Sequence, residues 1–260
     1  ALIGQEPMVQ TLKNAFEAGR IAQAWMLTGV RGVGKTTTAR ILARALNYRL
    51  DDVDAPNVDL TIPGEHCAAI MEGRHVDIVE MAAASHTGID DIKQIIDGVR
   101  YAPVSARYKV YIIDEIHMLS EKAFNALLKT LEEPPPHAKF IFATTEIRKV
   151  PITVLSRCQR FDLRRVEADV LAKHLKSIAE QESVEIDEAS LAMIARAGEG
   201  SVRDALSILD QAIAHTNAKV DEQSVRDMLG LADRGRVVRL FEKLMSGDMV
   251  GTLDDFKSLY

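Results

Sequence analysis

The stretch GVRGVGKT, residues 29–36, decides the fold of this chain, because it fits the phosphate-loop pattern G-x-x-x-x-G-K-[ST]. An apolar run at residues 25–28 predicts a short buried strand before the stretch. Apolar residues at helical spacing over residues 37–47 predict a helix after it. A chance glycine-rich loop would not bring both neighbours, so we predict that the chain binds a nucleotide.

The residue types in this stretch predict how phosphates are held. Glycines allow backbone N–H groups to face anionic oxygens, and the positive end of the following helix adds to the attraction. Lys35 would reach the β- and γ-phosphates, and the Thr36 hydroxyl would ligate Mg²⁺. The nucleotide-binding residues that we predict are Gly29, Gly32, Val33, Gly34, Lys35, Thr36 and Thr37.

Composition narrows the remaining classes of protein. The 260 residues are 47% hydrophobic and 27% charged, with a formal net charge of −6. This charge argues against a protein that coats nucleic acid as a monomer, although it leaves room for a basic strip inside an assembly. No apolar run approaches the roughly 20 residues that span a bilayer, so we expect no membrane contact and a cytoplasmic location.

Alternating strands and helices predict the architecture of the first part of the chain. Apolar runs predict further strands at residues 77–81, 109–114 and 139–145, and a last short strand is expected at residues 159–163. Helical spacing predicts helices at residues 5–20, 66–71, 89–99 and 121–133. This order predicts an α/β P-loop NTPase fold, with a parallel sheet, right-handed crossovers and helices on both faces.

After Arg164 and Arg165 the pattern changes to helices only. Helices are predicted at residues 167–181, 187–197, 201–215 and 221–229, with Asp187, Ser201 and Asp221 as N-caps. We therefore expect a nucleotide-binding domain at residues 1–165 and a small helical domain at residues 166–230. Two further helical stretches at residues 233–260 are expected to belong to the beginning of a third domain at residues 231–260.

Asp114 and Glu115 end a predicted buried strand, and ligands of open α/β sheets bind at the carboxyl ends of strands. In a P-loop protein that hydrolyses nucleotide, Asp114 would hold Mg²⁺ through water and Glu115 would orient the attacking water. Acids also end strands for structural reasons, but that alternative does not explain the pairing with a phosphate loop. Thr144 and Thr145 end the neighbouring strand, so we expect one of their hydroxyls beside Glu115.

Two arginines are candidates for contact with phosphates. Arg157 follows a short helix at the domain edge, and we expect it to act on the γ-phosphate bound by a neighbouring chain. Arg203 opens a helix of the second domain. It would either reach back to the phosphates or form a salt bridge with Asp204 or Glu199.

The cysteines and their neighbours do not predict a metal site. Cys67 and Cys158 are too few for a disulfide framework or a four-cysteine zinc site. His66, Cys67 and His75 lack a second thiol and regular ligand spacing. We expect a packed thiol, solvated histidines and no zinc.

Six stretches together resemble one family, the gamma/tau subunits of the bacterial DNA polymerase III clamp loader. They are IGQE at residues 3–6, GVRGVGKT at 29–36, DEIHML at 114–119, NALLKTLEEP at 125–134, SRC at 156–158 and GSVRDAL at 200–206. The resemblance implies an AAA+ ATPase domain, a helical lid and the beginning of an oligomerising collar domain. It also implies Thr145 as sensor 1, Arg157 as a trans-acting arginine finger and Arg203 as sensor 2.

The same resemblance implies an activity and partners. The chain would bind and hydrolyse ATP with Mg²⁺ to load a sliding clamp onto primer-template DNA, as the ATPase of a DNA-directed DNA polymerase (nucleotidyltransferase) holoenzyme in the nucleoid-associated replisome. Its partners would be other clamp-loader subunits, copies of itself, the sliding clamp, DNA and, through a longer form, the polymerase core. Lys93 and Lys129 match positions that resemble DNA-backbone contacts of the family.

The chain also departs from the family pattern. Many relatives carry a four-cysteine zinc module where this chain has residues 51–73 with Cys67 alone, so zinc is not carried over. Ala82 stands where the family usually has Asp, and His86 stands where it often has Arg. These two departures weaken the expectation of a DNA contact near these residues, but they affect none of the phosphate-binding residues. Two alternatives remain: a structural clamp-loader arm without hydrolysis, disfavoured by the intact phosphate loop, and an AAA+ branch-migration helicase, which would need a winged-helix domain absent from these residues.

Overall fold

The structure is a computed structural model that describes residues 2–85, 88–216, 219–230 and 234–259. Contacts divide the chain into two compact units. The first is made of residues 1–167 with 201–203, and the second of residues 168–200 with 204–260. The division into three domains remains a prediction.

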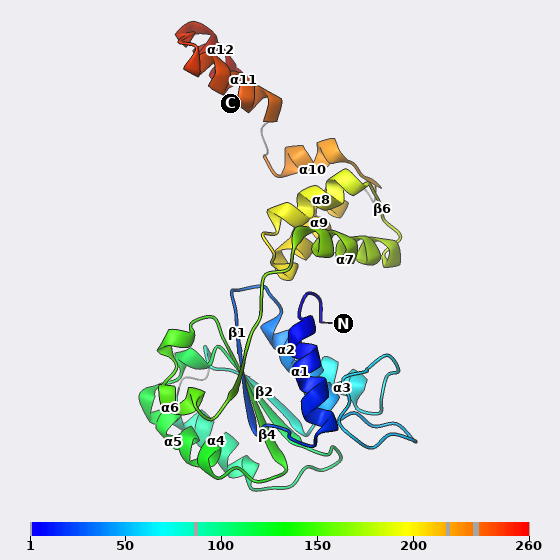
Figure 1. The fold of residues 1–260 in the computed structure, drawn as a ribbon, viewed down its shortest axis with the longest axis vertical. Helices are drawn as coiled ribbons and strands as arrows, with labels where there is room; N and C mark the ends of the chain where they lie inside the picture. Colours follow the sequence, from blue (N-terminus) through cyan, green and yellow to red (C-terminus); the bar gives the residue numbers. More distant parts are fainter. Residues whose placement is uncertain (1, 86–87, 217–218, 231–233, 260) are drawn as a thin grey trace. The chain divides into compact units, whose positions relative to one another are not determined.

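The first unit is built on one parallel sheet of five strands in the order β2-β3-β4-β1-β5 (Figure 1). The strands are β1 Ala24–Thr28, β2 Ile78–Ala82, β3 Lys109–Asp114, β4 Ala138–Thr144 and β5 Gln159–Asp162. Thr28 lies opposite Thr144 and Ala82 lies opposite Asp114, so the carboxyl ends of neighbouring strands meet at one edge. The predicted α/β fold is confirmed.

Helices cover both faces of this sheet, as predicted. One face carries α1 Glu6–Glu17, α2 Lys35–Leu46 and α3 Cys67–Met71, and the other carries α4 Ile89–Val99, α5 Glu121–Glu132 and α6 Ile152–Leu155 (Figure 1). In β3, Tyr111 and Ile113 belong to the core under α4 and α5, whereas Val110 and Ile112 belong to the core under α1 and α2. Burial on both faces is the reason that the inner strands β1, β3 and β4 are mostly apolar runs.

Lys139 is a charged residue inside β4 and is only 3% exposed. Its Nζ donates hydrogen bonds to the Ala22 carbonyl at 3.1 Å and to Gln23 Oε1 at 3.0 Å, and it lies 5.0 Å from the centre of the Tyr108 ring. Burial lowers the pKa of Lys139 to about 8. Neutral acceptors satisfy the ammonium group, but burial still penalises its charge.

The second unit is largely helical. It contains α7 Ala168–Gln181, α8 Glu188–Ala197, most of α9 Val202–Thr216, α10 Glu222–Met228, α11 Arg234–Met245 and α12 Met249–Leu259. The Asp187 side chain accepts a hydrogen bond from the Ser190 N–H at 2.6 Å, and Asp221 accepts one from the Ser224 N–H at 2.9 Å. These two predicted N-caps are confirmed, and α9 begins directly after Ser201.

The expectation that this part contains helices only was wrong. A short strand, β6 Glu185–Ile186, pairs in parallel with β7 Lys219–Val220. Each strand stands directly before the N-cap aspartate of a helix. Two residues are too few to show the alternation of a strand, so the helical pattern on either side hid both of them.

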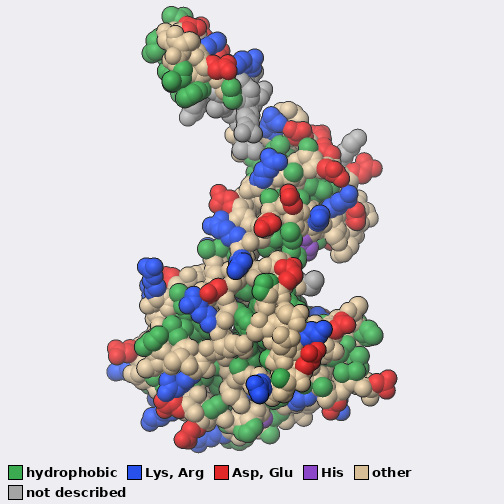
Figure 2. Space-filling view, in the orientation of Figure 1, with side chains coloured by type: hydrophobic (Ala, Val, Ile, Leu, Met, Phe, Trp, Pro, Cys, Tyr) green, Lys and Arg blue, Asp and Glu red, His purple; other side chains and the backbone are tan. Residues whose placement is uncertain are grey.

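The α11–α12 pair exposes large apolar side chains (Figure 2). Phe241 is 60% exposed, Met245 71%, Val250 74% and Phe256 50%. Apolar patches of this kind mark surfaces of interaction. Neither these helices nor any other within the described ranges combine the length and apolar character that crossing a bilayer requires.

We predict that Lys139→Met abolishes an increase in the free energy of unfolding that the native chain shows between about pH 8 and pH 10.5. Below about pH 8, Lys139 is protonated in both the folded and the unfolded chain. Between about pH 8 and pH 10.5 it is protonated only in the unfolded chain, so the free energy of unfolding increases as the pH rises through this range. The gain is about 1.4 kcal/mol per pH unit within this window. Urea unfolding, followed by the fluorescence of the single tryptophan, Trp25, measures it.

Lys122→Met replaces an exposed lysine of α5 and is the matched control, which should keep the pH dependence of the native chain. If Lys139→Met also kept the native pH dependence of the free energy of unfolding, the buried ammonium of Lys139 would not be the source of that dependence.

Candidate nucleotide-binding site

The loop between β1 and α2 requires glycine at several positions. Gly32 has a φ of +83°, and Gly34, the N-cap of α2, has a φ of +89°. A Cβ atom on Gly29 would lie 2.8 Å from the Leu163 carbonyl oxygen, so a side chain there would collide with the backbone. Val33 is buried and Thr37 is exposed. The loop therefore presents backbone rather than side chains at the start of α2, which suits the approach of an anion.

Lys35 lies within this loop and is 6% exposed. Two backbone carbonyls accept hydrogen bonds from its Nζ, those of Gly29 at 3.0 Å and Val30 at 3.1 Å. Burial lowers the pKa of Lys35; Glu115 and Asp114 act in the opposite direction, and Arg203 adds to the lowering. A buried ammonium that is bonded only to neutral carbonyls among the described residues fits a ligand with negative charge.

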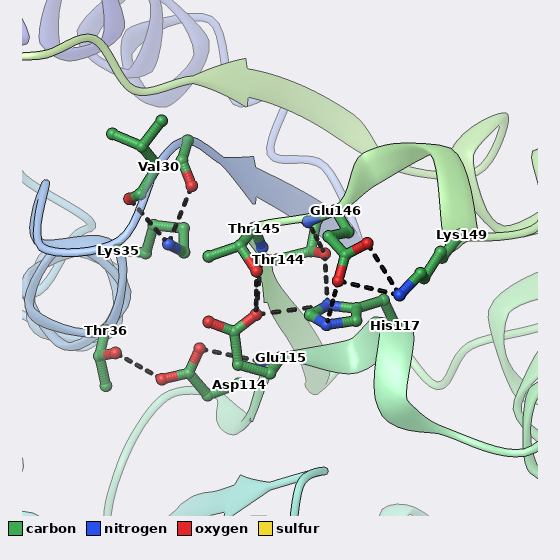
Figure 3. A network of polar contacts seen from close by, with 11 residues as sticks. Val30, Lys35, Thr36, Asp114, Glu115, His117, Thr144, Thr145, Glu146 and Lys149 are labelled. Carbon is green, nitrogen blue, oxygen red and sulfur yellow. Dashed lines mark hydrogen bonds and ion pairs between the residues drawn. The ribbon is translucent and has the colours of Figure 1, made fainter.

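Thr36 and Asp114 lie at the carboxyl edge of the sheet and touch each other. Thr36 Oγ1 donates a 2.5 Å hydrogen bond to Asp114 Oδ2, and Asp114 Oδ1 accepts one from the Glu115 N–H at 2.9 Å (Figure 3). A hydroxyl and a carboxylate are the oxygen ligands that Mg²⁺ prefers in proteins. The two predicted metal-binding residues are thus brought together, and their donor set fits that ion.

Glu115 follows β3 in a left-handed backbone conformation, with a φ of +50°. Its Oε2 atom accepts hydrogen bonds from the Thr145 N–H at 3.1 Å and from Thr145 Oγ1 at 3.0 Å (Figure 3). The expectation that one of the two threonine hydroxyls lies beside Glu115 is confirmed, and it is that of Thr145. Such backbone strain in a non-glycine residue is commonest at functional sites.

Three further residues lie near Glu115 and were not predicted from the sequence: His117, Glu146 and Lys149. His117, in the short helix η1 Ile116–Met118, places Nδ1 2.9 Å from Thr144 Oγ1. Its Nε2 lies 3.6 Å from Glu146 Oε1, and Glu146 is paired with Lys149 at 2.8 Å (Figure 3). The sequence indicates them only through their closeness to predicted site residues: His117 lies three residues after Asp114, and Glu146 directly follows Thr145.

The two predicted arginines have different surroundings. The Arg157 guanidinium lies 2.6 Å from Glu132 Oε1 of α5 and donates to the Thr153 carbonyl of α6 at 2.7 Å. The Arg203 backbone N–H donates to the Gly32 carbonyl at 3.4 Å, within the first unit. The backbone of Arg203 thus contacts the phosphate loop, whereas Arg157 contacts α5 and α6, on the face of the sheet opposite α2.

The predicted DNA-contact residues lie on neighbouring helices. Lys93 of α4 and Lys129 of α5 are both exposed, and Lys93 pairs with Asp90 at 3.0 Å. Ala82 lies opposite Asp114 in the sheet, whereas His86 is outside the described residues. A contact of these lysines with DNA remains a prediction.

His66 and His75 are buried rather than solvated, so that expectation was wrong. Nε2 of His75 lies 3.0 Å from Nδ1 of His66, and Nδ1 of His75 accepts a hydrogen bond from the Asp77 N–H at 3.1 Å. Cys67 Sγ accepts a hydrogen bond from the Gly64 N–H at 3.1 Å. Within the ranges that the structure describes, no three His, Cys, Asp or Glu side chains are grouped to hold a metal ion.

Three family models match successive parts of the chain. They are DNA polymerase III, delta subunit, at residues 4–167; DNA polymerase III clamp loader subunit, ATPase lid domain, at residues 170–218; and DNA polymerase III subunits gamma and tau domain III, at residues 220–260. The chain is 42% identical over 252 residues to DNA polymerase III subunit gamma of Buchnera aphidicola subsp. Acyrthosiphon pisum, covering 97% of this chain and 69% of that protein.

Tau subunits are similar as well. The chain is 43% identical over 247 residues to DNA polymerase III subunit tau of Escherichia coli, covering 95% of this chain and 38% of that protein. It is 47% identical over 213 residues to the Bacillus subtilis tau subunit, covering 82% of this chain and 37% of that protein. The chain thus spans less than two fifths of these tau relatives.

Among solved structures, the Holliday junction branch migration motor RuvB of Thermotoga maritima matches with a TM-score of 0.65. The match covers 93% of this chain and 76% of that chain at 21% sequence identity. At this identity the likeness shows the fold alone, so it does not favour a branch-migration helicase.

We predict that Gly29→Ala lowers the free energy of unfolding by about 1–3 kcal/mol, because the new Cβ collides with the Leu163 carbonyl. Gly19→Ala is the control: Gly19 has a φ of +65° but nothing within 4 Å of a Cβ, so only backbone strain is added, about 1 kcal/mol. Urea unfolding measures both. A smaller loss for Gly29→Ala than for Gly19→Ala would show that the loop yields to the collision.

Proposed function

The chain belongs to the gamma/tau subunit family of DNA polymerase III, and on this premise we propose that it is an ATP-driven clamp-loader subunit. It would bind and hydrolyse ATP to load a sliding clamp onto primer-template DNA, as the ATPase of a DNA-directed DNA polymerase holoenzyme. The observation that carries the proposal is the contact between Thr36 and Asp114, beside a Glu115 carboxylate held by Thr145. This arrangement is what a nucleotide-hydrolysing P-loop protein needs.

Different residues of the site would bind the phosphates, bind Mg²⁺ and orient the attacking water. Backbone N–H groups of residues 29–36 and the Lys35 ammonium would hold the phosphates, and Thr36 and Asp114 would hold Mg²⁺. ATP supplies the γ-phosphoryl group whose transfer to water releases energy. Glu115 would orient the attacking water, and Thr145 would keep the carboxylate in place as sensor 1.

The remaining residues would connect this site to an assembly. Arg157 would stabilise charge on a γ-phosphate held by a neighbouring copy or subunit, and Arg203 would report the state of the phosphates as sensor 2. Lys93 and Lys129 would contact the DNA backbone. The exposed apolar side chains of α11 and α12 support an oligomerising collar, and a longer form would reach the polymerase core in a cytoplasmic, nucleoid-associated replisome.

We predict that Lys35→Ala and Glu115→Gln separate binding from turnover. Lys35→Ala removes the buried positive charge that faces the phosphates and should weaken binding of a non-hydrolysable ATP analogue about 100-fold. Glu115→Gln should keep this affinity and lose turnover, because only the orientation of water is removed. Isothermal titration and phosphate release measure the two effects.

Lys122→Ala, at an exposed lysine of α5, is the control and should change neither quantity. Unchanged affinity in Lys35→Ala would refute the phosphate-loop assignment, and loss of affinity in Glu115→Gln would make that acid structural.

We predict that Arg157→Ala leaves ATP affinity nearly unchanged and lowers ATPase activity by a factor on the order of 10³ in the assembled protein, the range for a trans-acting arginine. Mixing full-length Arg157→Ala chains with Lys35→Ala chains should restore part of the activity, since a native arginine can then meet a native phosphate loop. Mixtures that assemble by light scattering but stay as inactive as either variant would show that Arg157 does not act between chains.

A further inference from the structure

His117 has a largely buried side chain that contacts the carboxylate proposed to orient water. Its side chain is 6% exposed. Nδ1 lies 2.9 Å from Thr144 Oγ1 and 3.3 Å from Glu115 Oε2, and Nε2 lies 3.6 Å from Glu146 Oε1 (Figure 3). One ring therefore bridges the acid after β3 and the segment after β4.

The contacts of the Glu115 carboxylate are concentrated on one of its two oxygens, Oε2. Thr145 donates twice to Oε2, and His117 Nδ1 approaches the same atom. Among the residues that the structure describes, Oε1 receives no hydrogen bond. A carboxylate anchored by one oxygen leaves the other with its lone pairs directed away from the anchor, which is the arrangement that orienting a water requires.

The backbone at Glu115 makes this anchoring necessary. Its left-handed conformation is strained for a residue with a side chain, and such a conformation persists only where surrounding contacts hold it. Thr145, directly after β4, donates two hydrogen bonds to the carboxylate, and the His117 ring lies against the same oxygen from the turn that follows Glu115. Without the ring, the side-chain torsions of Glu115 would be restrained from one side only.

We propose that His117 is a positioning residue for Glu115, which sets the direction of the free carboxylate oxygen through its Nδ1 atom. The inference rests on the proposed ATPase function. On the other side of the ring, Nε2 lies 3.6 Å from Glu146 Oε1, and Glu146 is paired at 2.8 Å with Lys149 of the short helix η2 Ile147–Lys149. Glu146 also donates its N–H to Thr144 Oγ1 at 3.0 Å, so the hydroxyl that contacts Nδ1 is itself held in place.

The two ring nitrogens give two separable substitutions. An Asn side chain places its amide near the position of Nδ1, whereas the longer Gln side chain places its amide near that of Nε2. If Nδ1 carries the effect, His117→Asn should retain most of the function and His117→Gln should not. A residue that only fills space would not distinguish the two amides.

The experiment measures steady-state ATP hydrolysis and analogue binding on the full-length chain assembled with its partner subunits. We expect His117→Ala and His117→Gln to lower kcat about 10- to 100-fold, the range for residues that orient a functional group, with KM and analogue affinity within about twofold of native. His117→Asn should lie within about threefold of the native kcat. His137→Ala is the control: His137 bonds the Val99 carbonyl at 3.0 Å, at the opposite end of β4, and its loss should leave kcat unchanged.

A native kcat in His117→Ala would overturn the proposal, as would equal kcat values in the Asn and Gln variants. Trp25 fluorescence monitors folding, and if His117→Ala does not fold, the comparison of Asn with Gln decides. Adding His117→Ala to Glu115→Gln should lower kcat no further, because the positioned group is already lost. If native and Glu115→Gln proteins hydrolyse ATP equally, the proposed function fails; if they differ and the His117 variants do not, only this inference fails.

Discussion

The hydrogen bond from Thr36 Oγ1 to Asp114 Oδ2 joins the first turn of α2 to the end of β3, and the rest of the site depends on it. At 2.5 Å it brings a hydroxyl and a carboxylate close enough to share one cation. The buried Lys35 ammonium lies on the same turn as the hydroxyl, and Glu115 follows the carboxylate directly. A parallel sheet makes this possible, because the loop after β1 and the loops after β3 and β4 emerge at the same edge.

Much of this arrangement could be predicted from the sequence, since continuous apolar runs locate strands and the phosphate-loop pattern locates the anion site. Strand ends that meet at one edge also predicted a threonine hydroxyl, of Thr144 or Thr145, beside Glu115. The position of His117 could not be predicted, because it depends on the left-handed turn at Glu115, which no residue pattern indicates. Glu146 and Lys149 were missed because their place beside His117 depends on how the segments after β3 and β4 meet. β6 and β7 were missed because two-residue strands carry no periodicity, and His66 and His75 were misplaced because burial cannot be inferred for isolated histidines.

The surroundings of Arg157 bear on how chains would cooperate. Its ion pair with Glu132 joins side chains that are 33% and 52% exposed, and such surface pairs contribute only about 0–1 kcal/mol. The adjacent Cys158 is instead packed against the core, and burial raises the pKa of its thiol to about 12. The backbone of this segment is therefore anchored, while the guanidinium at its surface is held weakly and can exchange Glu132 for another anion at little cost.

The contact between His66 and His75 determines which ring nitrogen carries the proton in each histidine. Because His75 Nδ1 accepts the Asp77 N–H, the proton of that neutral ring belongs on Nε2, from which it is donated to Nδ1 of His66. The proton of His66 then belongs on its Nε2, so the tautomers of both rings follow from one backbone N–H. Burial, with His66 adding to it, lowers the pKa of His75 against the opposing effect of Asp77. A further proton on His75 Nδ1 would face the Asp77 N–H, donor against donor, so the two rings, which join the start of α3 to the segment before β2, keep this arrangement only while His75 is uncharged.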